Sequence, residues 1–280
     1  MSEWLPSLVL PFQLPFMRDA FLIGALIAVP TALLSCFLVL KGWALMGDAV
    51  SHAVLPGVVL AYVAGVPLLL GAFAAGLFCA VAVGWLADNS RVKRDTVMGV
   101  VFAGMFGLGL VLFAAVPSDI HLDTILYGNM LGVLPGDIAV AASVALGVGL
   151  GVLLLWRDLL AHSFDAAHAR TVGLPVGWLH YGLLAALSAT VVATLSAVGL
   201  VLAIGLLIAP GAVAFLLVRS FGLMLLAAVA VNLVAMLLGT YAAFWIDAAP
   251  APTVILVLTV LFVLALLLRV RRNRRAEATA

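Results

Sequence analysis

The residues best suited to chemistry in this sequence are Asp48 and His52, in the stretch Gly47-Asp48-Ala49-Val50-Ser51-His52. A spacing of four places a carboxylate and an imidazole on one face of a helix, about 5–6 Å apart at their Cβ atoms. Together the two side chains offer oxygen and nitrogen ligands to a divalent transition metal such as manganese, iron or zinc. The structural alternative is that Asp48 caps the start of a helix and His52 hydrogen-bonds to a nearby carbonyl.

The elements that must position this pair are membrane helices. Of the 280 residues, 66% are apolar and only 9% are charged, whereas soluble domains are about 45–50% apolar and about 25% charged. This composition excludes a soluble globular protein, a disordered protein and a nucleic-acid binder, and it predicts an all-α polytopic membrane protein. A charge beside or within the bilayer is costly, and this favours a functional role for Asp48 and His52.

Nine apolar runs are candidate spans, and a count of eight is nearly as well supported. One run, Val50 to Gly65, is short, and another, Gly199 to Val218, is interrupted by Pro210 and Gly211. The runs are Ala20 to Leu40, Val50 to Gly65, Pro67 to Leu86, Val97 to Val116, Ile138 to Trp156, Trp178 to Ala197, Gly199 to Val218, Leu223 to Ile246 and Thr253 to Leu268.

Basic residues in short loops predict the orientation, because they are retained on the cytoplasmic side. Arg91, Lys93 and Arg94 mark one cytoplasmic loop, and the arginines that follow Leu268 place the C-terminus inside. The loop from Val116 to Pro135 contains Asp119, His121 and Asp123 but no Lys or Arg, so we expect it outside, where it either attracts cations or is simply solvated. With nine spans, the N-terminus is also outside.

Two further groups of residues leave their role open. Cys36 and Cys79 lie in apolar runs and are expected to be buried thiols. His162, His168 and His180 lie near the predicted cytoplasmic face, either as scattered interfacial histidines or as a second metal site.

The segment from Lys41 to Gly57 closely resembles the signature of the manganese/zinc/iron ABC-transporter permeases, the membrane subunits of metal importers. Three more stretches match this family in the same order: Pro15 to Arg18, Phe164 to Pro175, and Gly205 to Pro210. The resemblance implies a type II ABC-importer-like permease with about 8–9 transmembrane helices. It also implies that Asp48 and His52 correspond to the family's metal-contacting Asp and His within the membrane.

The same resemblance assigns roles to two other regions. Residues 158–177 become a cytoplasmic ATPase-docking segment with Asp165, Ala169, Gly173 and Leu174 as its key residues. Pro210 with Gly211 becomes a helix break that lines the path, and a simple proline kink is the alternative. Asp165 can cap the start of a short helix from Ala166 to Thr171, and Gly173 lies just past the end of that helix. Residues 1–16 are an interfacial N-terminal segment, residues 17–270 the transmembrane permease domain, and residues 271–280 a basic cytoplasmic tail.

The expected function is the permease subunit of an ATP-binding-cassette importer for divalent metal, most of all manganese or iron, with zinc as a third candidate. The alternative is a permease for a larger substrate such as a siderophore or cobalamin. The chain has no GxxxxGK[ST] motif and is not expected to be an enzyme, so ATP belongs to a separate ATPase. No permanently bound cofactor is expected. The other expected partners are an extracytoplasmic metal-binding protein, a second permease in a homodimer or heterodimer, and the lipid of a bacterial plasma (inner) membrane, with no nucleic acid.

Overall fold

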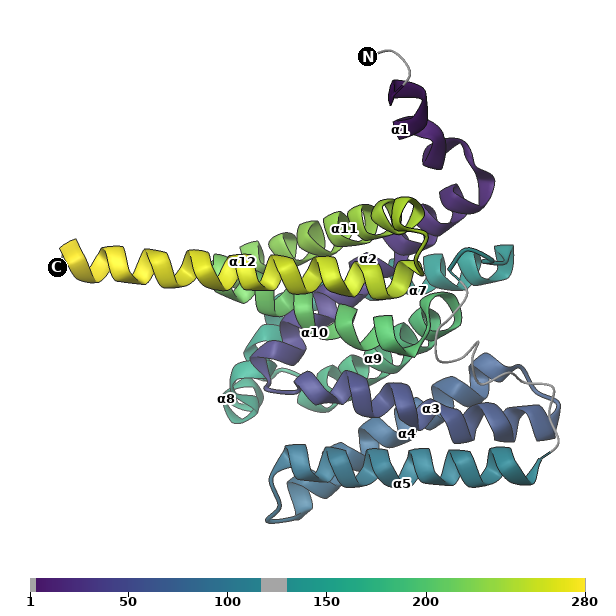
Figure 1. Cartoon of the computed structure of the whole chain (residues 1–280). Helices are drawn as coiled ribbons and strands as arrows, with labels where there is room; N and C mark the ends of the chain where they lie inside the picture. Colours follow the sequence, from purple (N-terminus) through teal and green to yellow (C-terminus); the bar gives the residue numbers. More distant parts are fainter. Residues whose placement is uncertain (1–3, 117–129, 280) are drawn as a thin grey trace.

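The computed structural model describes residues 4–116 and 130–279, and these residues form helices joined by short connections, without a strand (Figure 1). The helices are α1 (Trp4–Gln13), α2 (Pro15–Leu40), α3 (Ala44–Ala64), α4 (Leu68–Asn89), α5 (Arg94–Ala115), α7 (Pro135–Phe164), α8 (Ala166–Thr171), α9 (Val176–Val198), α10 (Leu200–Leu217), α11 (Phe221–Ile246) and α12 (Pro250–Thr279). The all-α prediction is confirmed for this part of the chain.

Eight of the described helices are long and apolar enough to cross a membrane: α2, α3, α4, α5, α7, α9, α11 and α12. The ninth predicted span, α10, has 18 residues, which corresponds to about 27 Å of helix. Figure 1 shows that α2 begins at one end of the bundle and α12 finishes at the other end. Opposite ends require an odd number of passes, and among the described helices α10 supplies the ninth.

The helices pack in two groups around α2. Ile23 and Ile27 in the first half of α2 are buried in a core with residues of α10, α11 and α12. Phe37 and Leu38 in its second half are buried in a core with residues of α3, α4 and α9. In Figure 1, α10, α11 and α12 lie on one side of the bundle and α3, α4 and α5 on the other. The long helix α2 therefore connects the group that contains Asp48 and His52 to the rest of the molecule.

The predicted helix break at Pro210 and Gly211 is wrong, because α10 is continuous through both residues. Proline removes one backbone donor, but such a loss is tolerated in a membrane helix whose neighbours enclose it. Both residues are buried, and a Cβ at Gly211 would lie 2.6 Å from the carbonyl oxygen of Ser35 in α2. Pro210 and Gly211 are therefore buried inside the chain, and Gly211 packs against α2. The interruption lies at Gly199, whose φ of 81° and ψ of 172° separate α9 from α10 and suit only glycine.

Candidate metal site

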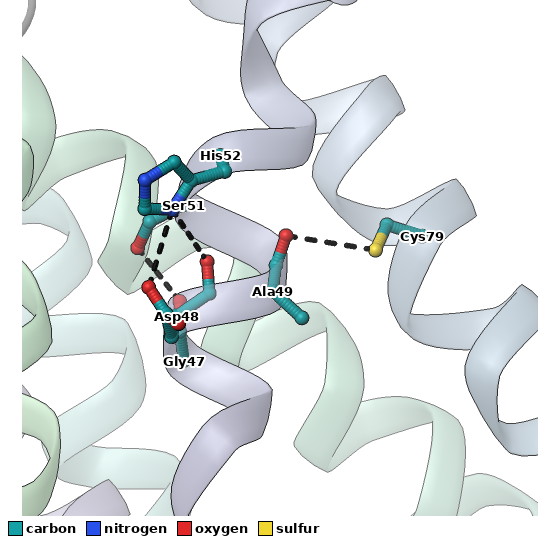
Figure 2. Close-up of polar contacts among 6 residues, drawn as sticks. All are labelled: Gly47, Asp48, Ala49, Ser51, His52 and Cys79. Carbon is teal, nitrogen blue, oxygen red and sulfur yellow. Dashed lines mark hydrogen bonds and ion pairs between the residues drawn. The ribbon is translucent and has the colours of Figure 1, made fainter. Parts of the chain in front are cut away.

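Asp48 and His52 lie in the interior of α3 and touch each other. His52 Nδ1 is 3.2 Å from Asp48 Oδ1 and 3.1 Å from the carbonyl oxygen of Asp48 (Figure 2). The helix begins at Ala44, after Trp43, six residues before the predicted start of the span at Val50. Asp48 is therefore not the helix cap of the structural alternative, although the predicted contact of His52 with a carbonyl is present.

These contacts determine which nitrogen of His52 is available to a ligand. Both partners of Nδ1 are oxygen acceptors, so the neutral ring carries its proton on Nδ1 and donates it to Asp48. Nε2 then keeps a lone pair and is directed away from Asp48 (Figure 2). Histidines that bind metals usually donate their other ring N–H to a carboxylate or carbonyl in this way. The side chains of His52 and Asp48 are 18% and 32% exposed, so an ion can reach both.

Two phenylalanines of α5 hold the imidazole from the side. The rings of Phe102 and Phe106 lie 4.8 Å and 5.3 Å from the His52 ring, at interplanar angles of 78° and 82°. Such edge-to-face contacts are favourable and restrict the orientation of the ring. No sequence pattern pointed to these residues, because they lie about fifty positions from His52 in an apolar run where phenylalanine is unremarkable.

Close backbone contacts position α3 itself. A Cβ on either Gly57 of α3 or Gly71 of α4 would collide with the backbone carbonyl of the other residue, so the two helices meet at their glycines. The buried Cys79 thiol of α4 contacts the carbonyl oxygen of Ala49 at 3.7 Å (Figure 2). Ser51 donates to the carbonyl oxygen of Gly47 at 2.7 Å, which satisfies its hydroxyl inside the helix. Asp48 and His52 thus belong to a tightly packed helix rather than to a loop.

In this rotamer Nδ1 of His52 contacts Asp48 and Nε2 is directed away from it, so one ion can be held by both side chains only after the His52 ring turns. The chain then supplies no more than a pair of ligands at this place. Among the described residues, no group of three or more His, Cys, Asp or Glu side chains is placed to hold a metal ion. Asp119, His121 and Asp123 lie outside the described residues. A metal at Asp48 and His52 would complete its coordination with water or with groups from another chain.

The predicted docking segment contains a short helix, α8, with a defined start and end. The Asp165 carboxylate accepts hydrogen bonds from the backbone amides of Ala167 and His168 at 2.8 and 3.0 Å. Gly173 has a φ of 85°, and the amides of Gly173 and Leu174 donate to the carbonyls of Arg170 and Ala169. This pair of bonds is a Schellman motif, which ends a helix at a left-handed residue.

The electrostatics of α8 agree with this geometry. The hydrogen bonds from His168 and Ala167 lower the pKa of the Asp165 carboxyl below its ordinary value of 3.8. Ala169 is buried against the bundle, while its neighbours His168 and Arg170 are exposed. The segment is thus anchored by one small side chain and presents the others outward.

Comparison with known proteins relates this chain to a family of transport membrane proteins. The model of the family described as the ABC 3 transport family matches residues 13–269. The chelated iron transport system membrane protein YfeD of Yersinia pestis is 52% identical over 92% of this chain and 86% of that protein. The manganese transport system membrane protein MntB of Synechocystis is 42% identical over 93% of this chain and 85% of that protein. The structure of PsaBC from Streptococcus pneumoniae in complex with Fab superposes with a TM-score of 0.83 at 30% identity, covering 93% of this chain and 95% of that one.

Proposed function

The chain belongs to the ABC 3 transport family and is a metal-transporting ABC permease, and we propose that it moves divalent manganese or iron ions past Asp48 and His52, with zinc as a third candidate cargo. The observation that carries the proposal is the contact between the two side chains, with the Nδ1 proton of His52 held by Asp48 and Nε2 left as a ligand.

The small number of ligands suits transport better than storage. An ion that enters a narrow path loses water, and a carboxylate oxygen and an imidazole nitrogen offset part of that loss. The ion must also leave, so the site should bind it only transiently. A second permease, identical or related, would bring its own Asp and His to the path and raise the number of ligands to four.

The names of the relatives indicate the cargo. One relative is named for manganese and another for chelated iron. A bare ion can be coordinated by Nε2 of His52, whereas an ion that a siderophore has fully enclosed has no coordination position to offer, and a cobalamin-sized substrate has no evident need for this pair. The Asp48–His52 pair therefore favours free divalent ions over the larger substrates.

The chain requires partners to work. It lacks the phosphate-binding motif of an ATPase, so ATP is hydrolysed on a separate subunit that contacts residues 158–177 through α8. Asp165 and Gly173 fix the ends of α8, Ala169 anchors it, and Leu174 begins the return to the bundle. An extracytoplasmic metal-binding protein delivers the ion to the opposite end.

The distribution of charge supports a proposed orientation of the bundle in the membrane. Figure 1 places α8, the turn between α4 and α5, and the end of α12 at one end of the molecule. The basic residues at positions 91, 93, 94, 170, 219, 269, 271, 272, 274 and 275 belong to that end, and Arg18 is at the other. By the preference of basic residues for the cytoplasm, residues 271–280 form a cytoplasmic tail. The N-terminal segment 1–16 then lies at the outer interface of a bacterial plasma membrane, and residues 17–270 form the permease domain.

Uptake by the reconstituted complex tests this function. The permease is co-purified with its ATPase and partner permease, placed in proteoliposomes with the delivery protein, and supplied with ATP. We expect ATP-dependent uptake of manganese and iron ions, and no uptake of ferric siderophores or cobalamin. Uptake of a chelate without uptake of the free ions would contradict the proposal.

A further inference from the structure

A second polar site lies at the end of the bundle that carries α8. Here a cavity of about 420 Å³ is bordered by the ends of α2, α4, α7, α8 and α9. Its lining includes Lys41, Trp85, His162, Arg170, His180 and Tyr181. Lys41 lies in the connection after α2, and the others belong to α4, α7, α8 and α9. None of them belongs to the candidate metal site, although His162 and Arg170 lie in the segment 158–177 of the proposed ATPase contact.

The two histidines do not form a metal site. Lys41 Nζ lies 3.3 Å from His162 Nε2, and because an ammonium group can only donate, Nε2 must accept. That lone pair is therefore occupied. The neutral His162 ring then carries its proton on Nδ1, a buried atom without a hydrogen-bond partner among the described residues. A cation beside the Lys41 ammonium would also be repelled.

The chemistry of the lining suits an anion. Lys41 and Arg170 bring two positive charges to the cavity, and no carboxylate is among the described residues that line it. Ammonium and guanidinium groups form charge-assisted hydrogen bonds to phosphate oxygens, and the Tyr181 hydroxyl at the rim can donate a further bond. The site therefore matches a phosphate group rather than a metal ion.

The rim of the cavity indicates the source of the phosphate. Trp85 and Tyr181 are 64% and 57% exposed, and exposed Trp and Tyr rings at the ends of spans mark the depth of lipid headgroups. Basic pockets between the ends of membrane helices bind anionic headgroups on this principle. We propose that this cavity binds the phosphate group of an anionic phospholipid.

The bound headgroup would link α8 to the bundle. Arg170 and Ala166 belong to α8, whereas Lys41 directly follows α2. A phosphate held between Arg170 and Lys41 would connect the two elements without a direct contact between them. This inference does not depend on the proposed cargo, since it concerns binding by the permease alone.

Native mass spectrometry of the purified full-length chain, titrated with phosphatidylglycerol or phosphatidylcholine, tests the proposal. We expect the protein to prefer phosphatidylglycerol. The double variant Lys41→Gln/Arg170→Gln should bind this lipid at least about tenfold more weakly, since each basic residue contributes to headgroup attraction. Lys41→Arg/Arg170→Lys keeps the charges and should retain binding. The matched control is Arg157→Gln, because Arg157 lies over the Trp156 ring instead of lining the cavity; its affinity should match that of the wild type.

Three outcomes would overturn the proposal. They are equal binding of the two lipids, unchanged phosphatidylglycerol binding by a double variant that elutes as a folded protein, and saturable binding of inorganic phosphate by the same residues without any lipid preference. A fourth outcome would also contradict the proposal. If the double variant loses its association with the ATPase but keeps lipid binding, the cavity serves the partner subunit.

Discussion

Asp48 and His52 show what the spacing of residues can predict and what it cannot. A separation of four in an expected helix predicted that the two side chains would meet, and they are 3.2 Å apart. The choice of nitrogen depends on a side-chain rotamer that places Nδ1 over two oxygens of Asp48. The supporting rings of Phe102 and Phe106 depend on how α5 packs against α3, which no local pattern encodes.

Gly57 provides a test of the packing that positions this pair. Because a Cβ at Gly57 would collide with the backbone of Gly71, we expect Gly57→Ala to separate α3 from α4 and to cost about 1–3 kcal/mol, as overpacking does in well-packed cores. The measurement is the midpoint of thermal unfolding in detergent. Gly147→Ala in α7 is the control, since a Cβ there has nothing within 4 Å, and its midpoint should not fall. Equal midpoints for the two variants would show that the glycine contact is unimportant.

At the scale of single helices, the two ends of α8 were predictable, whereas the continuity of α10 through Pro210 was not. The two ends of α8 depend on local chemistry, an Asp at the start and a Gly just past the end, and both are present. Pro210 is an equally clear local signal, yet α10 continues through it. The tolerance of that proline depends on the helices that enclose it, which the sequence of α10 does not contain.

The end of α8 gives a prediction about coupling. We expect Gly173→Ala to strain the left-handed residue by about 1–2 kcal/mol, to displace the segment after α8, and to lower the number of metal ions imported per ATP hydrolysed. Gly182→Ala is a matched control, because Gly182 lies within α9, outside the segment 158–177, and a Cβ there would meet nothing within 4 Å. The measurement is the number of metal ions imported per ATP hydrolysed. If both variants keep the wild-type ratio, α8 is an ordinary connection.

The start of α8 gives a prediction about pH. The folded state lowers the pKa of Asp165 below 3.8, so its contribution to stability is complete above about pH 4 and is lost as the pH falls through the lower folded value. We expect that the titration of Asp165 does not change the coupling ratio between about pH 5 and pH 8. Asp165→Asn, which keeps an acceptor oxygen, should therefore couple better than Asp165→Ala throughout this range. A crossover of the two variants within the range would contradict the assigned cap.

At the scale of the molecule, the number of membrane passes determines which connections share a side of the membrane, and so it must agree with the orientation. The sequence left eight or nine spans because the run Val50 to Gly65 is short and the run Gly199 to Val218 contains Pro210 and Gly211. Eight of the described helices are long enough to span, and the course of the described chain between opposite ends of the bundle (Figure 1) agrees with α10 as a ninth. The orientation could be predicted from the sequence, because basic residues recur in every second connection. The approach of α12 to α10 and α11 was not, since it joins segments with no common pattern.

Cysteine labelling of intact cells tests the orientation. The native Cys36 and Cys79 are buried and should not react. Ala248 and Asn273 are exposed in the connection before α12 and in its final part. A membrane-impermeant maleimide should modify Ala248→Cys and spare Asn273→Cys until the cells are opened, and the reverse pattern would invert the assignment.

The decisive measurement is ATP-driven manganese uptake by the assembled complex that carries Asp48→Asn. This substitution keeps the shape of the side chain and removes its charge, so Asp48 no longer holds the His52 ring as a carboxylate or attracts the ion. We predict that uptake falls at least about tenfold, in line with the loss when a carboxylate beside a metal-binding histidine is removed, and that His52→Ala has a similar effect. Asp137→Asn is the matched control, since Asp137 accepts the amide of Leu134 at the start of α7 and lies far along the chain from the site. Near-normal uptake by both Asp48→Asn and His52→Ala in correctly assembled complexes would contradict the assignment of the metal path to this pair.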